Sequence, residues 1–337
     1  MTAPPPVSVL LPVRDGEAHL VDAAASLEAQ SDPDFEVVAV DDGSTDGTRE
    51  ILEAWALRDR RVRVLPQPPS GIVAALERGR AAARGRYLAR MDADDACEPR
   101  RLARQRALMD ANPALAACGA QVRYFPAEHV REGARRYEAW LNAHATPEEL
   151  ERELFVECPI AHPALFARAH AVAGVGGYRA PGWPEDYDLV LRLWEAGGRL
   201  ANVPEPLLWW REGAGRLSRT DPAYAPDAFR RCKAHFLART LLAGGRGAVV
   251  WGAGPVGKAF ARALADVGVP VRAFVEVDPR KLGQTIHGAP VLDTGKGLEV
   301  PGALHLAAVG QPGRRAELRR ILAGAGLVET RDFVAVA

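Results

Sequence analysis

Residues 37–48 have the sequence VVAVDDGSTDGT, in which an apolar, β-branched run passes directly into acidic residues, glycines and hydroxyl side chains. Residues 87–95, YLARMDADD, repeat this design, with a short apolar run that ends in aspartates. Such runs are typical of buried strands in parallel sheets, and the carboxyl ends of those strands line the crevice where ligands bind. The two stretches therefore predict an α/β fold with acidic groups at one edge of its sheet.

The rest of the first hundred residues alternates strand and helix signals. Apolar runs predict two more strands, at residues 7–11 and 62–65, and helical spacing of apolar residues marks the segments between strands. This alternation implies βαβ units, right-handed crossovers and a mostly parallel sheet. Helices are expected at residues 17–30, 51–56, 72–83, 100–110, 147–154, 186–196 and 227–242, and a further extended segment at 116–125.

A glycine-rich break at residues 244–247 separates this region from a second strand-and-helix pattern. A chain of 337 residues is long enough for two domains. We therefore place the boundary at the break, with residues 1–243 as the first domain and residues 244–337 as the second. In the second domain, strands are expected at residues 248–251, 271–277 and 333–336, and helices at 255–267 and 314–323.

The composition is that of a folded protein without a strong overall charge. Apolar residues make up 48% and charged residues 26%, which excludes a generally disordered chain. Because 43 basic residues balance 43 acidic ones, net charge gives no argument for a nucleic-acid partner or a membrane surface. The four widely spaced cysteines are interpreted as buried thiols rather than as a disulfide framework or zinc site. They are Cys97, Cys118, Cys158 and Cys232.

The start of the chain has neither the basic nor the apolar region of a secretion signal. No uncharged stretch reaches the roughly 18 residues that a membrane-spanning helix needs. We therefore expect a cytoplasmic protein that touches a membrane, if at all, from the cytoplasmic face.

Carboxylates follow both of the apolar strand runs described first. Asp42 can accept a hydrogen bond from a nucleotide base, although the run around it also fits a turn that caps the next helix. Asp92 and Asp94 lie on the same side of an extended segment, where they can hold a hard divalent cation that neutralises a diphosphate. A solvated turn is the alternative. Later in the chain, Asp186 opens a helix, either as a favourable N-terminal charge or as a general base.

In this order, the motifs resemble family 2 of the inverting nucleotide-sugar glycosyltransferases, which have the GT-A fold. The resemblance covers residues 6–219 and is greatest to bacterial members that build capsule, exopolysaccharide or O-antigen. It rests on PVRDGE at 12–17, DDGSTD at 41–46, Gly71 with residues 74–79, ARMDADD at 89–95, HP at 162–163, GGY at 176–178, EDYDL at 185–189, Arg211 and Ser218.

The resemblance implies a donor, an acceptor and a nucleotide site. The donor would be a nucleotide-diphosphate sugar, with a UDP-sugar favoured, and the acceptor a hydroxyl of a glycan or lipid-linked molecule. Pro12, Arg14 and Gly71 would line the nucleotide-sugar pocket, and Asp42 would contact the base. Peripheral contact with the inner membrane or with other polysaccharide-assembly enzymes is part of the same expectation.

The resemblance also implies a mechanism. Asp92 would lie toward the ribose, and Asp92 and Asp94 would form the DXD motif that holds Mg²⁺ or Mn²⁺. Asp186 would be the catalytic base, removing the proton from the acceptor hydroxyl while that oxygen attacks the anomeric carbon opposite the diphosphate. One such displacement inverts the configuration, so that an α-linked donor gives a β-glycoside.

Further residues are implied around the acceptor. Glu185 would orient the acceptor or the base, His162 would contact the acceptor or only complete a turn, and Trp183 and Arg211 would lie nearby. Two departures from the family affect this region: Glu77 stands where relatives often carry Asn, and residues 211–219 lack a histidine that assists the metal in some relatives. We therefore expect a weaker metal site.

In the second domain, residues 249–257, VVWGAGPVG, combine a strand with a G-x-G-x-x-G loop and a helix start. Glu276 lies at the end of the next strand, where a ribose-binding acid would lie. The domain resembles the small Rossmann-like domains attached to bacterial sugar dehydratases, sugar-phosphate transferases and sugar acetyltransferases. It would either bind a nucleotide or serve a structural or partner role. The glycines of its phosphate loop are Gly252, Gly254 and Gly257.

A rival hypothesis assigns the chemistry to this second domain. In it, the protein is a nucleotide-sugar or NAD(H)-binding oxidoreductase or sensor. The distribution of acids distinguishes the two hypotheses, and the acids cluster in the first domain.

Overall fold

The computed structural model describes residues 4–213, 215–311 and 313–337. The first three residues, which belong to the start searched for a secretion signal, lie outside this range. The chain forms two compact units. The first unit comprises the residues up to 150 together with 159–181 and 185–219, and the second comprises 151–158, 182–184 and 220–337.

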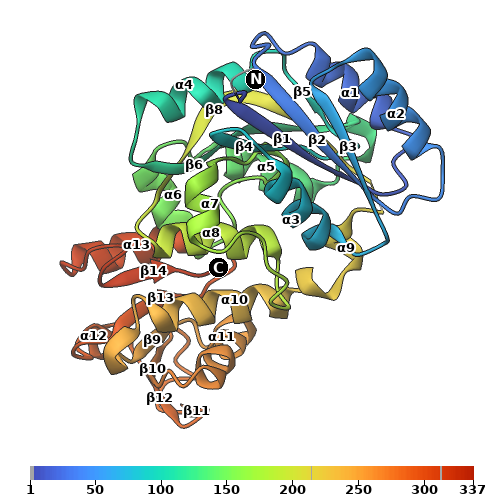
Figure 1. The fold of residues 1–337 in the computed structure, drawn as a ribbon. Helices are drawn as coiled ribbons and strands as arrows, with labels where there is room; N and C mark the ends of the chain where they lie inside the picture. Colours follow the sequence, from blue (N-terminus) through green and yellow to red (C-terminus); the bar gives the residue numbers. More distant parts are fainter. Residues whose placement is uncertain (1–3, 214, 312) are drawn as a thin grey trace. The chain divides into compact units, whose positions relative to one another are not determined.

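The first unit contains an eight-stranded sheet (Figure 1). Strands β3, β2, β1 and β4 are parallel, β7 runs antiparallel to both of its neighbours, β6 and β8 pair in parallel, and β5 is antiparallel to β8. In spatial order the strands are β3 (Val62–Gln67), β2 (Phe35–Asp42), β1 (Val7–Val13), β4 (Tyr87–Arg90), β7 (Phe166–Arg168), β6 (Leu115–Phe125), β8 (Arg199–Arg211) and β5 (Ala96–Cys97).

Helices cover both faces of this sheet. The helices of the first unit, two of which continue into the second, are α1 (Leu20–Glu28), α2 (Thr48–Arg58), α3 (Ile72–Ala82), α4 (Arg101–Ala111), α5 (Glu132–Asn142), α6 (Pro147–Glu153), α7 (Ala169–Gly174), α8 (Glu185–Glu195) and α9 (Leu217–Thr220). Short 3₁₀ turns add η1 (Ala127–His129) and η2 (His162–Ala164).

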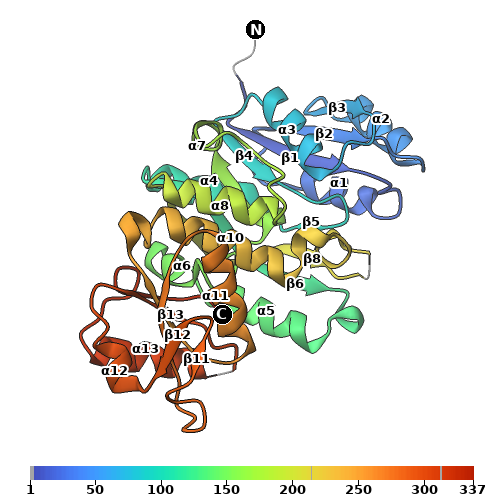
Figure 2. The same cartoon turned by 90° about the horizontal axis from the view of Figure 1, so that it is seen from below.

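Strand β1 is buried on both faces because its successive side chains enter different helix layers. Val9 lies in one apolar cluster with Leu20 of α1 and Trp55 of α2. The next residue, Leu10, faces the opposite way, where a Cβ on Gly79 of α3 would lie 3.5 Å from its side chain. Figure 2 shows α1 and α3 on opposite sides of β1. This packing confirms the predicted α/β class and fixes the carboxyl ends of β1, β2 and β4 at one edge.

The strand-and-helix pattern predicted for residues 7–91 is confirmed, with element ends shifted by a few residues. The sequence did not predict β7, α5 or β8. Strand β8 contains Pro204 and Pro206, which cannot donate ladder hydrogen bonds, and its register with β6 shifts between Ala120 and Val122 to accommodate them. The proline signal therefore hid a strand that leads directly to Arg211.

The second unit contains a six-stranded sheet with the order β11-β12-β10-β9-β13-β14. When its parallel strands are counted along the chain, the order is 3-2-1-4-5, that of a doubly wound α/β sheet. The sequence did not predict β13, which lies beside β9 at its centre. The strands are β9 (Ala248–Trp251), β10 (Val271–Val275), β11 (Thr285–Ile286), β12 (Ala289–Leu292), β13 (Leu304–Ala307) and β14 (Phe333–Ala335). The helices are η3 (Pro222–Tyr224), α10 (Pro226–Arg239), η4 (Ala243–Gly245), α11 (Pro255–Asp266), α12 (Thr294–Leu298) and α13 (Arg314–Gly324).

The domain boundary after residue 243 stays a prediction. By its contacts, α10 belongs to the same compact unit as the second sheet.

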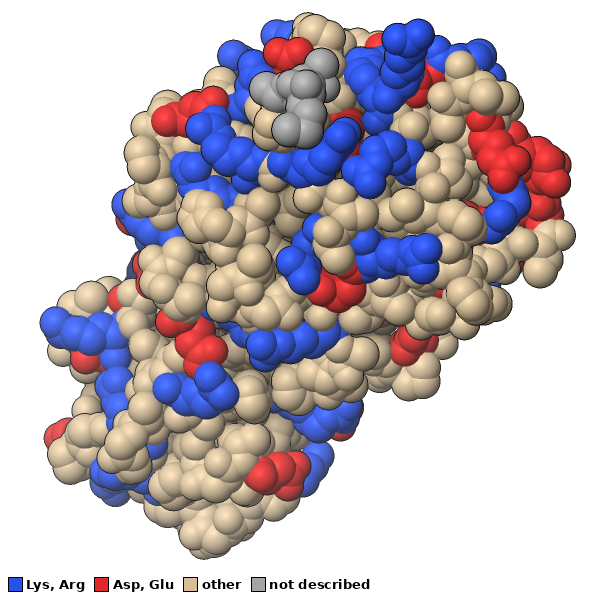
Figure 3. Space-filling model, in the orientation of Figure 1, with Lys and Arg blue, Asp and Glu red and all other residues tan. Residues whose placement is uncertain are grey.

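On the face shown in Figure 3, basic and acidic side chains are interspersed, with basic ones gathered toward the top of the view. All four cysteines are buried, as expected of packed thiols.

At the amino-terminal edge of the first sheet, Glu36 of β2 carries a buried carboxylate that is 2% exposed. It accepts hydrogen bonds from the Ser8 hydroxyl at 2.7 Å, the Arg84 amide at 2.8 Å and the Arg63 guanidinium at 3.1 Å. Burial alone would raise the pKa of Glu36, but the bonds from Arg84, Ser8 and Arg63 outweigh it and lower the pKa. The ionised form therefore stabilises the fold.

We predict that Glu36→Gln lowers the free energy of unfolding by about 1.5–3 kcal/mol at pH 7, the range for hydrogen bonds to a charged group. Because the native pKa is lowered, the stabilisation is present above the ordinary glutamate pKa and is lost as pH falls through it toward the native value. Urea unfolding of both proteins at pH 7 and pH 4 tests this. An equal difference at the two pH values would contradict it.

Candidate active site

The loops after β1 and β2 are joined by hydrogen bonds. The Asp15 amide donates to the Ser44 hydroxyl at 3.0 Å, and the Asp15 carboxylate accepts from the Thr45 amide at 2.8 Å. Asp15 has a φ of 49°, a conformation that non-glycine residues adopt infrequently. Pro12 lies near the end of β1, paired with Val40, so the first motif and the DDGSTD run form one continuous edge.

Asp42 organises a third loop at this edge. Its side chain is buried, and its carboxylate accepts from the Gln67 amide group at 2.7 Å and from the backbone amides of Ser70 and Gly71 at 2.8 Å each. Gly71, which immediately precedes α3, has a φ of +88°, a backbone conformation that favours glycine. In this structure Asp42 therefore holds the loop that carries Gly71. Contact with a base stays a proposal.

Three aspartates converge after β4. One carboxylate oxygen from each of Asp92, Asp94 and Asp95 can be chosen so that all three atoms lie within 4.8 Å of one another. Asp95 is 1% exposed, and its Oδ1 accepts from the Arg211 amide at 2.7 Å. Its Oδ2 is buried and has no hydrogen-bond partner among the described residues. This oxygen is chemically unsatisfied unless a cation or a bridging donor meets it.

The proximity of these acids changes their protonation. Burial, followed by the charge of Asp92, raises the pKa of Asp94. Burial, followed by the charges of Asp92 and Asp94, raises the pKa of Asp95 well above its ordinary value. A bound cation would reverse this effect, because it favours the ionised form of every carboxylate around it.

Two arginines support the aspartate turn from the protein side. Arg90, which is 4% exposed, forms an ion pair with Asp92. Arg211, at the end of β8, donates from Nε to the Asp94 carbonyl at 2.6 Å. Two further arginines pair with the buried carboxylate of Glu212. They are Arg216 and Arg219.

A second polar cluster lies around the start of α8. His162 Nδ1 lies 3.5 Å from Glu185 Oε1, and its Nε2 lies 3.4 Å from the Tyr178 hydroxyl. Burial, and then the positive charge of Arg90, holds the pKa of His162 well below its usual value, so the ring is neutral. Glu77, the departure from the family, accepts from the Tyr178 amide at 2.5 Å and thereby ties α3 to this cluster.

Arg101 joins the two clusters. Its buried guanidinium donates from Nη2 to the Arg90 carbonyl at 2.6 Å and to the Pro163 carbonyl at 2.7 Å. The aspartate turn and the His162 turn are therefore fixed to one buried cation. Asp186 follows Glu185, is half-buried, and accepts at Oδ1 from the Tyr187 amide at 2.7 Å.

Asp188 has a different environment from Asp186. It is 3% exposed and forms an ion pair with Arg192 at 2.7 Å, and Arg192 in turn donates to the Val175 carbonyl at 2.7 Å. A buried pair of this kind fixes α8 to the turn after α7. The carboxylate at 188 is therefore part of the packing, while the carboxylate at 186 is partly accessible.

Trp183, the glycine loop and Glu276 lie in the second unit, whereas Arg14 lies in the first, 3.8 Å from the Asp15 carboxylate. The ring of Trp183 packs against that of His235, with 5.2 Å between the ring centroids. In the glycine loop, Gly252 has a φ of +110°, and a Cβ on Gly257 would lie 1.9 Å from the Gly252 carbonyl oxygen, so neither position accepts a side chain. Glu276 accepts from the Ala253 amide at 3.2 Å. Glu276 also forms an ion pair with Lys281 at 2.8 Å. Gly254 is the residue immediately before α11.

Known proteins match the part of the chain that contains the aspartate cluster. The family model "Glycosyl transferase family 2" matches residues 8–173. EpsE of Bacillus subtilis (strain 168) is 31% identical over 233 residues, which make up 67% of this chain and 80% of that protein. The chain belongs to glycosyl transferase family 2. The amylovoran biosynthesis glycosyltransferase AmsE of Erwinia amylovora is 28% identical over 215 residues, covering 63% of this glycosyltransferase and 78% of AmsE.

Solved structures show the same fold at low identity. TarS residues 1–349 of S. aureus in complex with UDP-GlcNAc has a TM-score of 0.57 at 18% identity, over 69% of this glycosyltransferase and 66% of that chain. The mannosyltransferase PcManGT of Pyrobaculum calidifontis, in complex with GDP-Man and Mn²⁺, has a TM-score of 0.52 at 19% identity, over 79% and 76%. These neighbours confirm the GT-A fold of the first unit.

The acidic strand ends could be found from the sequence, whereas the roles of Arg90 and Arg101 could not. Arg90 was detectable as a charged residue at the end of an otherwise apolar strand, and Asp95 as the third acid in a run. Arg101 gave no signal, because its bonds to the Arg90 and Pro163 carbonyls, 11 and 62 residues away, follow no local sequence pattern. Across the part of the chain that the structure describes, no helix is long and apolar enough to cross a membrane.

We predict that Asp188→Asn lowers the free energy of unfolding by about 3 kcal/mol, the lower end of the range for breaking a buried ion pair. Asp186→Asn, the same substitution two positions earlier, should leave stability nearly unchanged. Urea unfolding of both variants measures the difference. Equal stability of the Asp188→Asn variant and the parent protein would show that the Asp188–Arg192 pair does not support α8.

Proposed function

We propose that this family 2 glycosyltransferase is a metal-dependent, inverting enzyme of bacterial surface-polysaccharide synthesis. It would transfer a sugar from a nucleotide-diphosphate sugar, preferably a UDP-sugar, to a hydroxyl of a glycan or lipid-linked acceptor. The observation that carries the proposal is the aspartate cluster after β4, with the buried and unpartnered Oδ2 of Asp95 beside Asp92 and Asp94.

This cluster fits a divalent cation. Mg²⁺ and Mn²⁺ prefer oxygen ligands, and carboxylates are their usual protein partners. Asp94 and Asp92 would hold the ion, with Asp95 behind them, and Asp92 would also lie toward the ribose. When bound, the ion would neutralise charge that develops on the diphosphate leaving group. The nucleotide would contact Pro12, Arg14, Gly71 and Asp42 along the same sheet edge.

The chain's own residues would supply the proton transfer. Asp186 would accept the proton of the acceptor hydroxyl as that oxygen attacks the anomeric carbon from the face opposite the diphosphate. Glu185, the residue before Asp186, forms a pair with His162, with 3.5 Å between Glu185 Oε1 and His162 Nδ1. Because His162 is neutral, this pair would orient the acceptor rather than neutralise the base. No covalent intermediate on the enzyme is needed, and one displacement inverts the anomeric configuration.

The relatives support the donor and acceptor classes. The TarS and PcManGT structures hold UDP-GlcNAc and GDP-Man, respectively, so nucleotide-diphosphate sugars fit this fold with either base. AmsE is named for amylovoran biosynthesis. A cytoplasmic location, with peripheral contact to the membrane or to other assembly enzymes, is part of the proposal because nucleotide sugars and lipid-linked acceptors meet at that face.

The second unit is proposed to be an accessory domain. Its strand order and the tight glycine loop of Gly252, Gly254 and Gly257, with Glu276 beside it, support nucleotide binding there. No observation favours the rival function of an oxidoreductase or sensor acting through this unit, because both the family match and the aspartate cluster lie in the first. A melting-temperature shift with NAD(H), but not with UDP and Mn²⁺, would reverse this preference.

We predict that Asp94→Ala abolishes the enhancement of UDP binding by Mn²⁺, because the ion loses its main protein ligand. Calorimetry of UDP binding with and without Mn²⁺ measures the effect. Glu36→Gln is a suitable control, since it neutralises a buried carboxylate at the opposite sheet edge and should retain the enhancement. An enhancement of the same size in the Asp94→Ala variant would remove the metal assignment.

The full proposal is tested by incubating the protein with Mn²⁺ and a panel of UDP-, GDP- and dTDP-sugars and measuring nucleotide release. We expect release from at least one UDP-sugar. Asp186→Asn should bind that donor normally but lose about 10²–10⁴-fold in kcat, the usual contribution of a positioned base. Asp188→Asn, assayed where it is folded, should retain kcat. Consumption of no nucleotide sugar, or near-normal kcat in the Asp186→Asn variant, would contradict the proposal.

A further inference from the structure

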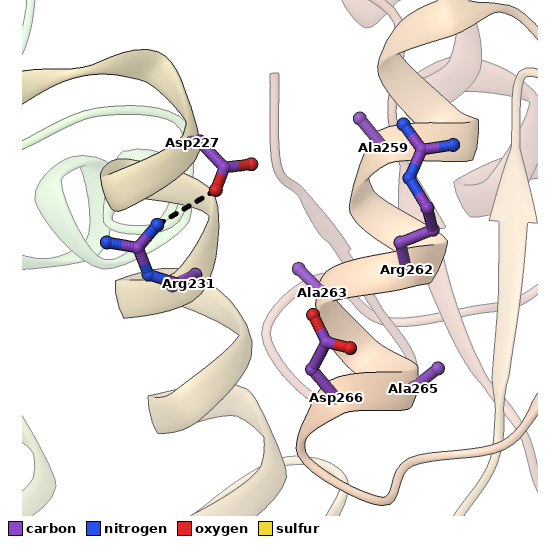
Figure 4. Close-up of a pocket in the computed structure, with 7 residues that line it drawn as sticks. All are labelled: Asp227, Arg231, Ala259, Arg262, Ala263, Ala265 and Asp266. Carbon is purple, nitrogen blue, oxygen red and sulfur yellow. Dashed lines mark hydrogen bonds and ion pairs between the residues drawn. The ribbon is translucent and has the colours of Figure 1, made fainter.

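In the second unit, a hollow of about 330 Å³ lies between α10 and α11 (Figure 4). Four of the side chains that line it are charged, and they are Asp227, Arg231, Arg262 and Asp266. Asp227 and Arg231 already pair with each other at 2.8 Å, and the four charges cancel. The hollow therefore favours neither an anionic nor a cationic ligand. In the first unit, by contrast, the polar contacts around Tyr178 bear directly on the proposed site.

Glu77 of α3 holds the turn that carries Tyr178. Its Oε1 accepts from the Tyr178 amide at 2.5 Å, and Arg80, also on α3, pairs with the same carboxylate at 2.9 Å. A Cβ on Gly177 would lie 2.2 Å from Glu77 Oε1, so the carboxylate fills the space that a side chain at 177 would need. Gly177 also has a φ of +67°, which glycine adopts without steric cost. Glu77 therefore fixes the backbone position of Tyr178.

The side chain of Tyr178 reaches His162. Tyr178 is 5% exposed, its hydroxyl lies 3.4 Å from His162 Nε2, and the two ring centroids are 5.6 Å apart. On the other side of the imidazole, His162 Nδ1 lies 3.5 Å from Glu185 Oε1. The line of contacts that begins at Glu77 therefore reaches the residue before Asp186. All of these residues belong to the first unit.

The neighbours of His162 distinguish its two ring nitrogens. The ring is neutral, so one nitrogen donates a hydrogen bond and the other accepts one. A carboxylate oxygen accepts, which favours a proton on Nδ1, beside Glu185. Nε2 is then the acceptor, and the group that faces it is the Tyr178 hydroxyl. Burial raises the pKa of Tyr178, so this hydroxyl keeps its proton and can donate it.

We propose that Glu77 and Tyr178 are positioning residues of the transferase site. Together they hold His162 in the tautomer that carries its proton on Nδ1, directed at the Glu185 carboxylate. The inference rests on the proposed function, in which this pair orients the acceptor beside Asp186. Both residues act through His162 rather than on the reacting groups. A displacement of about 1 Å at such a site can reduce a rate by 10²-fold, so their loss should affect kcat rather than donor binding.

Proton–nitrogen NMR of the histidine rings reads the tautomer directly and needs no sugar donor. His162→Gln removes one set of ring signals and thereby assigns them. In the parent protein we expect His162 to show a protonated Nδ1 and an unprotonated Nε2. Tyr178→Phe keeps the buried ring and removes only the donor, so the variant should fold and the tautomer ratio should shift about tenfold toward a protonated Nε2, as follows from losing one hydrogen bond.

The same spectrum tests Glu77. Glu77→Ala should shift the His162 tautomer ratio in the same direction as Tyr178→Phe. Glu77→Gln should keep the parent pattern, because its amide oxygen can still accept from the Tyr178 amide. Glu53→Ala is the matched control, since it removes an exposed glutamate from α2 of the same unit, and it should leave the His162 signals unchanged.

Activity gives the second readout, with the UDP-sugar that the donor panel identifies. Tyr178→Phe and Glu77→Ala should each lower kcat for UDP release by about tenfold, with the Kd for UDP and Mn²⁺ unchanged. Glu77→Gln should restore most of the loss, and Glu53→Ala should have the parent kcat.

Three results would overturn the inference. The first is a protonated Nε2 on His162 in the parent protein, the second is a parent-like His162 spectrum in the Tyr178→Phe variant, and the third is a loss of UDP binding as large as the loss of kcat. Failure of the proposed function is distinguishable, because it would appear as near-normal kcat in the Asp186→Asn variant, whereas the tautomer of His162 is read without any donor.

Discussion

The site depends on the repulsion among three carboxylates that the chain brings together after β4. Two unit charges 4 Å apart cost about 4 kcal/mol at the effective dielectric constant of a protein surface, so three such groups cannot all be ionised without nearby positive charge. Arg90 supplies one charge through Asp92, and Arg211 fixes the turn through the Asp94 carbonyl. Neither arginine reaches Oδ2 of Asp95, which has no hydrogen-bond partner among the described residues. A divalent ion at this position would make the whole arrangement favourable.

The architecture explains why this cluster can be built. Strand β4 lies between β1 and β7, so the strand that leads into the acids is paired on both edges and its direction is fixed. Arg101 uses two carbonyls, one from Arg90 and one from Pro163, to join the aspartate turn to the His162 turn. A guanidinium is suited to this role because it remains charged when buried and donates in several directions.

Much of the first sheet could be predicted from the sequence, because buried parallel strands are apolar runs and their loops carry glycine and aspartate. Asp42, Asp92 and Asp94 could be selected in the same way, and Asp186 could be selected as an acid at the start of a helix. Strand β8 could not, because its prolines resemble a loop, and β13 could not, because four residues with a central histidine are ambiguous. The interaction of that histidine is non-local: His305 accepts from the Trp251 indole at 3.0 Å.

The long-range contacts of the second unit also could not be predicted from the sequence. A domain boundary at residue 243 follows from glycines, whereas the contacts that bind residues 151–158 to α10 and α13 join positions far apart in the chain. Lys233 and Val156 are 77 residues apart, and Arg319 and Glu153 are 166 apart. Such pairings follow from the fold and not from any local pattern.

The central claim is a single inverting displacement assisted by a base at Asp186. It is tested most directly by proton NMR of the sugar first released when the parent enzyme, with Mn²⁺, hydrolyses an α-linked UDP-sugar in the absence of an acceptor. Water then takes the place of the acceptor hydroxyl, and the spectrum is recorded before the free sugar equilibrates between anomers. The account predicts that the β-anomer forms first. Initial formation of the α-anomer would contradict it.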